Sequence, residues 1–111
     1  MHKVLFYRTA SGNDVVLDFI RQLSPGEKKV VGEDLKAVQI GFPMGLPLCR
    51  ALGDGLYETR SSLPSKREFR LIFFFDRARQ CLLVVHALFK KSAKLPKADL
   101  DLARKRREEF R

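Results

Sequence analysis

Three short hydrophobic runs between Gly55 and Lys94 constrain the fold of this chain more than any other feature. The runs span residues 55–60, 67–75 and 82–89, and each is rich in aromatic, β-branched or aliphatic residues. Breaks that contain Pro, Ser, Asp and Arg separate them. This pattern predicts three consecutive strands, most simply an antiparallel meander. The nearly continuous apolar run of the last strand indicates a central strand that is covered on both faces.

The chain before these runs is expected to form one strand and two helices. Lys3–Tyr7 is predicted to be a strand, and residues 11–13 are expected to cap a helix of about ten residues that carries an apolar stripe. Ser24 is expected to begin a second helix as its N-cap, with Glu27 completing a capping box. Gly41 is expected to end that helix.

Residues 41–55 and the C-terminal segment complete the predicted order of elements. Residues 41–55 contain four Gly and two Pro, which predicts a long loop. A last helix is expected from Leu95-Pro96 to about Phe110. The order strand, helix, helix, three strands, helix indicates an α+β fold. Three residues are predicted to dock the last helix on the sheet: Leu100, Ala103 and Phe110.

Length and composition favour a single domain over residues 1–111. Hydrophobic residues make up 45% of the chain, which is enough for a core, yet no apolar run approaches the roughly 18 residues of a membrane span. The first residues do not resemble a signal peptide, so a cytoplasmic location is expected. Cys49 and Cys81 lie far apart without metal-ligand spacing, and small buried thiols are expected.

Positive charge is concentrated in the second half of the chain. The formal net charge is +9; residues 1–55 carry 7 Lys/Arg against 6 Asp/Glu, and residues 56–111 carry 15 against 7. Such a basic half indicates a polyanionic partner, with nucleic acid as the first candidate, an acidic protein as the second and an anionic membrane as the last. No membrane partner is expected. A basic surface that only aids solubility remains the alternative.

The alternation of side chains along the strands suggests a phosphate site. Leu56, Glu58 and Arg60 share one face of their strand, and Arg70 shares a face with Glu68 in the next. If both arginines lie on the same face of the sheet, two guanidiniums lie side by side and would bind a phosphate between them. The two glutamates are expected to pair with neighbouring basic residues.

RNA offers its own nucleophile, the 2′-OH, to such a cluster, so cleavage would require no metal or other cofactor. Arginines can neutralise the charge of the transition state, and a lysine near other cations has a lowered pKa and can act as a general base. Lys90, Lys91 and Lys94 are the candidates for that base. His86 is an alternative base, but its place in an apolar strand favours a core histidine with satisfied hydrogen bonds.

Other residues are expected to bind RNA around this cluster. Tyr57 could stack on a base or orient a phosphate, although packing explains it equally well. Arg50 lies in the predicted loop before the strands. Arg104 and Arg107 belong to a basic flank of the last helix, which would bind ribosomal RNA through salt-sensitive phosphate contacts.

Several segments resemble the HigB-like, phage-derived branch of the RelE/ParE toxin superfamily. Gly55–Arg60 (GLYETR) is similar to its "gLyElR" segment, and residues 70–74 (RLIFF) to its "yRilyf" strand. Residues 86–96 (HALFKKSAKLP) are similar to "lhgFvKKtqktP", and residues 98–107 to its last helix. The resemblance covers roughly residues 45–107.

The resemblance implies a small RelE-like α+β fold with the helices against one side of the sheet. It implies a type II toxin that cleaves mRNA on the translating ribosome, without metal, through Arg60, Arg70, Lys90, Lys91 and Lys94. It further implies a HigA-like antitoxin with a helix-turn-helix domain, and repression of the operator DNA by the toxin–antitoxin complex.

Two other functions remain open on the sequence. The same superfamily includes ParE-like toxins that act on gyrase, so the fold alone does not decide the activity. The chain could also be a phage-derived nucleic-acid-binding protein without catalysis.

Overall fold

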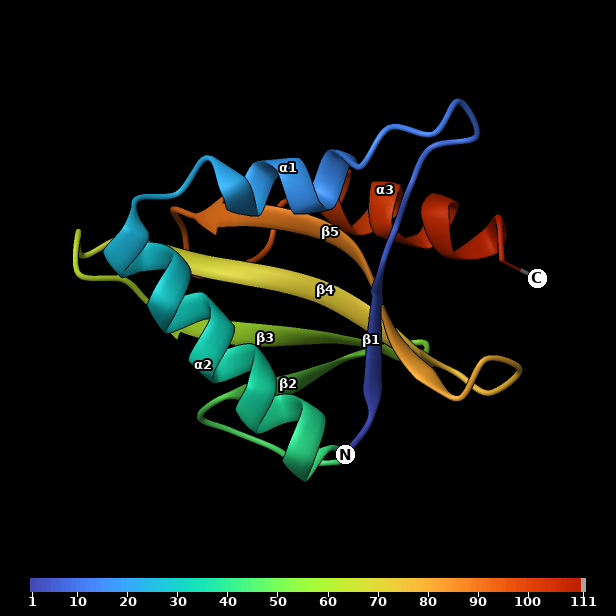
Figure 1. Cartoon of the computed structure of the whole chain (residues 1–111), viewed down its shortest axis with the longest axis horizontal. Coiled ribbons are helices and arrows are strands. Elements are labelled where there is room, and N and C mark those ends of the chain that lie inside the picture. Colours follow the sequence, from blue (N-terminus) through green and yellow to red (C-terminus); the bar gives the residue numbers. More distant parts are fainter. Residues whose placement is uncertain (111) are drawn as a thin grey trace.

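The chain folds into one five-stranded sheet and three helices, and the computed structural model describes residues 1–110 (Figure 1). The sheet has the order β1-β5-β4-β3-β2, with β1 parallel to β5 and every other pair antiparallel. The α+β class is therefore confirmed. The elements are β1 (Lys3–Phe6), α1 (Val15–Arg21), α2 (Pro25–Gly41), β2 (Cys49–Gly53), β3 (Leu56–Ser62), β4 (Glu68–Asp76), β5 (Cys81–Lys90) and α3 (Lys97–Glu108).

The antiparallel meander β3-β4-β5 is confirmed, and its register settles which residues share a face. Glu58 lies opposite Ile72, and Arg60 lies directly opposite Arg70. Glu68 in turn lies opposite Lys90 on β5. β5 runs between β1 and β4, and its residues from Cys81 to Val85 are fully buried, as expected for a central strand. The two arginines therefore belong to the same face of the sheet.

The prediction of a loop throughout residues 41–55 is wrong, because Cys49–Gly53 forms the edge strand β2. The short segment Cys-Arg-Ala-Leu-Gly has little β propensity of its own and pairs on one side only, with β3. A tight Asp-Gly turn joins the two strands: Asp54 has φ of 56° and Gly55 has φ of 76°. Pairing with β3, which sequence periodicity does not reveal, makes this segment a strand.

The helix α2 begins as the sequence predicts, and the helix α1 does not. The capping box of α2 is confirmed: Ser24 Oγ accepts from Glu27 N at 3.3 Å, and Glu27 Oε1 accepts from Ser24 N at 3.1 Å. α1 has seven residues, and its N-cap is Asp14 without a side-chain hydrogen bond, not one of residues 11–13. Residues 9–13 instead form a turn of their own, with Thr9 accepting from Gly12 N and Asn13 N.

Helices cover both faces of the sheet, so the expectation that they lie against one side is wrong. Phe19 of α1 packs against Phe69 and Phe89 at ring-centroid distances of 5.9 and 5.6 Å. α2 covers the same face, which we call the aromatic face. α3 packs on the other face, where its Asp99 meets His86 of β5. Figure 1 shows α1 and α2 on the near side of the strands and α3 beyond β5.

The core lies between these layers. The largest fully buried side chains include Phe69, Phe73 and Leu56, and Ala103 of α3 is also fully buried. Leu100 and Phe110 pack against this core, so the predicted docking of the last helix is confirmed. Both cysteines are buried and unpaired, as expected. No helix within residues 1–110 is long and apolar enough to cross a membrane.

Candidate functional site

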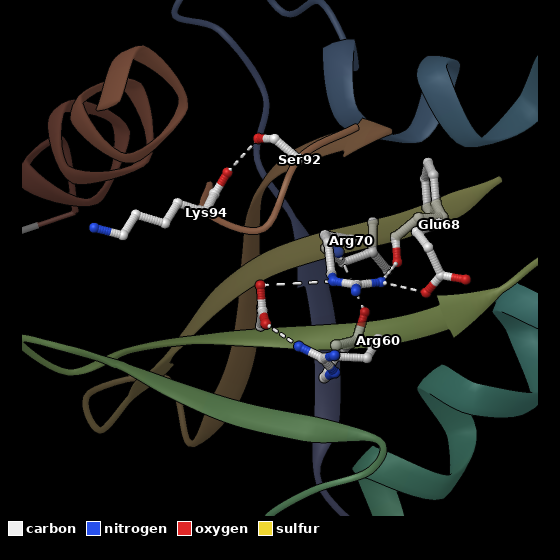
Figure 2. A network of polar contacts seen from close by, with 9 residues as sticks. Arg60, Glu68, Arg70, Ser92 and Lys94 are labelled. Atoms are coloured by element: carbon white, nitrogen blue, oxygen red, sulfur yellow. Dashed lines mark hydrogen bonds and ion pairs between the residues drawn. The ribbon is translucent and has the colours of Figure 1, made fainter. Parts of the chain in front are cut away.

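The site begins with two arginines that face each other across β3 and β4, joined by a buried glutamate. Arg60 Nη1 lies 2.9 Å from Glu58 Oε2, and Arg70 Nε lies 3.7 Å from Glu58 Oε1 (Figure 2). Glu58 is only 1% exposed. A carboxylate buried between two guanidiniums lets like charges stay adjacent, because each is attracted to it. The expected pairing of Glu58 with basic neighbours is confirmed.

The two arginines differ in how free they are. Arg70 is 2% exposed, and its Nη1 also donates to Phe69 O at 3.1 Å and lies 3.3 Å from Glu68 Oε1. These contacts fix the guanidinium on the sheet. The side chain of Arg60 is 28% exposed and has Glu58 as its ion-pair partner. Arg60 therefore keeps donors for a ligand, while Arg70 is held in place by the protein.

Lys90, at the end of β5, completes the cationic face, which we define by Glu58, Arg60, Glu68, Arg70 and Lys90. Burial is the main cause that lowers the pKa of the Lys90 amine. The guanidiniums of Arg70, Arg60 and Arg50 lower this pKa further, while the Glu58 carboxylate opposes them. The net effect is a lower pKa, which increases the share of Lys90 in the neutral form that can accept a proton.

A cavity of about 400 Å³ opens over this face. Two arginines and two lysines surround it, which is an arrangement suited to an anion. Its lining residues are Arg60, Glu68, Arg70, Lys90, Lys91, Ser92 and Ala93. A second cavity of about 290 Å³ adjoins it, since Lys90 and Ala93 line both. Arg50 and Lys94 line the second cavity and not the first.

The other lysines of the predicted set occupy different places. Lys91 is exposed and lines the cavity over Arg60 and Arg70. The side chain of Lys94 extends away from Arg60 and Arg70, and its carbonyl accepts a hydrogen bond from Ser92 Oγ at 2.9 Å (Figure 2). Of the three predicted lysines, Lys90 and Lys91 meet the arginines at one cavity, and Lys94 does not.

Tyr57 does not join the cationic face. It points to the aromatic face, where its ring lies 4.9 Å from Phe42 and 5.6 Å from Phe73, centroid to centroid. The alternation along β3 explains this placement, because Tyr57 precedes Glu58 by one residue. Of the two roles that the sequence left open, the structure shows packing.

The arginines of α3 are mostly engaged inside the protein, contrary to the expected free basic flank. Arg107 is buried and donates to Asp54 O and, at 2.7 Å, to Asp54 Oδ2. Arg106 donates to Val85 O at 2.8 Å and lies over the ring of Tyr7. Arg104 is half-buried beside Asp101 and Asp54. Arg107 thus ties α3 to the β2–β3 turn, and its placement does not support RNA binding.

His86 is a half-buried histidine with partners on α3. Its Nε2 lies 2.6 Å from Asp99 Oδ1, and its Nδ1 lies 3.4 Å from Arg106 Nη1. It does not line the cavity over Arg60 and Arg70. The interpretation of His86 as a core histidine with satisfied hydrogen bonds is therefore supported.

The site contains two features that the sequence analysis did not identify. One is the second cavity, which depends on the unpredicted strand β2 and on α3. The other is the double role of Glu58, although the Glu-x-Arg spacing on β3 indicated that Glu58 and Arg60 share a face. Among residues 1–110, no three His, Cys, Asp or Glu side chains gather in an arrangement that could hold a metal ion.

The fold and the site together define a small α+β domain that presents a cationic cluster on an antiparallel sheet. The family model described as "Phage derived protein Gp49-like (DUF891)" matches residues 18–108. The chain therefore belongs to this family, which is a family of RelE/HigB-like toxins. The matched segment includes every residue of the cationic face. The comparison with curated proteins gives no match.

Proposed function

We propose that this protein is the toxin of a type II toxin–antitoxin module, HigB-like in kind, that cleaves mRNA on the translating ribosome. The observation that supports this function is the shared cavity of Arg60, Arg70 and Lys90, in which burial lowers the pKa of the lysine. Membership of a toxin family supports the same proposal. A HigA-like antitoxin and operator DNA would be its partners, as the resemblance implies.

In the proposed mechanism, the scissile phosphate lies against the guanidiniums of Arg60 and Arg70. The neutral amine of Lys90 takes the proton of the RNA 2′-OH, and the 2′-oxygen attacks phosphorus. The arginines neutralise the charge that grows on the phosphorane oxygens. The bond to the 5′-oxygen breaks, the Lys90 ammonium returns the proton to it, and a 2′,3′-cyclic phosphate remains. Lys91 contacts the phosphate.

Primer extension on a defined mRNA, with and without translating ribosomes, tests this function. Wild type should produce cuts that require the ribosome, and Lys90→Met should lower cleavage by about a hundredfold, because a thioether cannot accept the proton. Arg77→Gln, at an exposed arginine of the β4–β5 turn, is the matched control and should cleave normally. Absence of cuts with folded wild type would contradict the proposal and favour a gyrase-directed toxin or a binder without catalysis.

A further inference from the structure

The two edge strands of the sheet differ in how well they are protected against pairing with another chain. β2 carries the exposed Arg50 and Gly53, and its register with β3 shifts between Ala51 and Gly53. β1 pairs with β5 without any shift of register, and Lys3 is its only charged residue. Charged side chains and irregular register are the usual protection of an edge strand. β1 is therefore the edge that is better suited to accept a further strand.

The free side of β1 offers backbone hydrogen-bonding groups. Tyr7, which directly follows β1, donates its N–H to Val84 O at 2.8 Å and thus faces β5. The direction of the backbone groups alternates along a strand, so Leu5 also faces β5, and Val4 and Phe6 face away from it. Within residues 1–110, no strand pairs with that side of β1. Val4 and Phe6 therefore each present an N–H donor and a C=O acceptor at the free edge.

A mostly apolar cavity of about 240 Å³ adjoins this edge. Leu5 and Phe6 of β1 line it, together with Leu83 of β5 and Phe110, which follows α3. Tyr7 shares a strand face with Leu5, and its ring lies 6.0 Å from that of Phe110, so the cavity lies on the face that α3 covers. A strand added to β1 would place one residue beside Leu5 with its side chain on the same face. An apolar side chain at that position would enter the cavity.

Two arginines that line the cavity indicate the charge of the partner. The side chains of Arg8 and Arg79 are 62% and 46% exposed. Arg8 pairs with Asp14 and Arg79 with Asp76, and each guanidinium retains further donors. A second copy of this chain would bring the same arginines to the edge, with a net charge of +9, and like charges oppose association. The charges therefore favour an acidic partner over a second copy.

We propose that β1 is a docking edge for an extended, acidic segment of a partner protein, which adds to the five-stranded sheet beside β1. The backbone of the segment pairs with Val4 and Phe6. One of its apolar side chains enters the cavity beside Leu5. Carboxylates two residues before and after that side chain lie on the same face and contact Arg8 and Arg79.

This docking edge lies away from the cationic face. β1 pairs with Cys81–Val84 at the beginning of β5, whereas Lys90 is the last residue of that strand. No residue lines both the cavity beside β1 and the cavity over Arg60 and Arg70. A docked segment therefore leaves the cationic face open, and the inference goes beyond the proposed cleavage of RNA and does not depend on it.

Titration of the full chain with synthetic peptides, followed by NMR, tests the docking edge. The probe is the blocked peptide Thr-Glu-Val-Leu-Val-Glu-Thr, and the control peptide has Lys in place of each Glu. The acidic peptide should shift the amide resonances of β1 and slow hydrogen exchange at Val4 and Phe6, whose amides face the free edge. Leu5 and Tyr7, which face β5, should change little. The basic peptide should bind about tenfold more weakly.

Two substitutions at Val4 provide a matched pair. Val4→Pro removes an N–H that faces away from β5, so the sheet should be retained, and affinity for the acidic peptide should fall about five- to tenfold. Val4→Ala keeps this N–H and should bind within about threefold of wild type, since the change removes only part of one side chain. If Val4→Pro does not fold, the exchange pattern of wild type alone decides, because only an added strand protects Val4 and Phe6 and leaves Leu5 unchanged.

The outcomes separate the docking edge from the proposed function. No binding of the acidic peptide, equal binding of the two peptides, or exchange protection outside β1 would overturn the docking edge, even if the protein cleaves mRNA on ribosomes. Protection of Val4 and Phe6 that grows with protein concentration, without any peptide, would assign the edge to a second copy and overturn the acidic partner. Selective protection by the acidic peptide would support the docking edge even if primer extension showed no cuts.

Discussion

Two arginine-rich regions of this protein, the meander β3-β4-β5 and the helix α3, both carry an excess of positive charge in the sequence and have opposite uses in the structure. On the meander, Arg60 and Arg70 lie opposite each other at a cavity that Lys90 also lines. On α3, Arg106 and Arg107 donate to backbone carbonyls of Val85 and Asp54. The difference teaches that the number of basic residues in a segment does not measure how many of them are available to a polyanion.

Removal of the freer strand arginine should have the largest effect on activity. Arg60→Gln keeps a polar side chain of similar length but loses the charge that would stabilise the phosphorane, so we expect ribosome-dependent cleavage to fall about 10²–10³-fold. Single-turnover cleavage of a defined mRNA measures it. Near-normal cleavage by folded Arg60→Gln would remove Arg60 from the mechanism. Arg70 is a poorer choice, since its loss leaves Glu58 buried with one partner fewer.

The pH dependence of cleavage should show whether Lys90 is the general base. Because a general base must be neutral, the rate should rise with pH and level off at a pH below the ordinary lysine pKa of about 10.4, since burial and the neighbouring guanidiniums lower the pKa of Lys90. Lys90→Arg has a side chain that stays protonated, so its cleavage rate should no longer show this rise with pH. Lys66→Arg, at an exposed residue of the β3–β4 turn, should retain it. An unchanged profile in Lys90→Arg would assign the base elsewhere.

The buried arginine of α3 should affect stability and not chemistry. Arg107→Ala removes the hydrogen bonds to Asp54, and we expect the free energy of unfolding to fall by about 1–3 kcal/mol. Urea denaturation measures the change, and cleavage per folded molecule should remain close to wild type. Lys105→Ala, at the exposed position two residues earlier, should change stability by less than about 0.5 kcal/mol. Loss of cleavage in well-folded Arg107→Ala would show that the helix arginine acts on RNA after all.

Arg67, in the β3–β4 turn, should contribute to stability in a pH-dependent way through its ion pair with Glu27. Hydrogen bonds from Ser65 and Arg67 lower the pKa of Glu27 from 4.5 to about 2. Because this pKa is lower in the folded state, the stabilisation is complete above about pH 4.5 and is lost as the pH falls toward 2. Urea midpoints at pH 7 and pH 3 should therefore differ less in Glu27→Gln than in wild type. Glu33→Gln, exposed on the same helix, should behave like wild type.

The smallest effect is expected at Arg104, the half-buried arginine of α3. It has weak contacts with Asp54 and Asp101, at 4.0 and 3.5 Å, and it retains some freedom to contact phosphate. Arg104→Gln should weaken ribosome binding only a few-fold and reduce its salt dependence by about one phosphate contact. Filter binding at several salt concentrations measures this. A loss as large as that of Arg60→Gln would contradict the distinction between the two regions.

Much of the fold could be predicted from residues close in sequence. Alternation and β-branched content predict the meander, and Ser24, Pro25 and Glu27 together predict the start of α2, because these signals act over a few residues. The strand β2 and the packing of α3 on the opposite face could not be predicted in this way. Both depend on pairing and packing with residues distant in the chain, and the composition of Cys49–Gly53 carries no strand signal of its own.

The features of the candidate site also fall into those that the sequence predicts and those that depend on contacts between distant residues. The sequence by itself determined that Glu58 shares a strand face with Arg60 and that Glu68 shares one with Arg70, because side chains alternate along a strand with a period of two. It also determined that the second half of the chain is strongly basic. Only the tertiary structure decided that the two faces coincide, that Lys90 rather than Lys94 meets the arginines, and that Tyr57 and Arg107 are packed away from them. Register and burial are collective properties: each emerges from all the contacts of the sheet and its helices, and no local pattern of residues contains it.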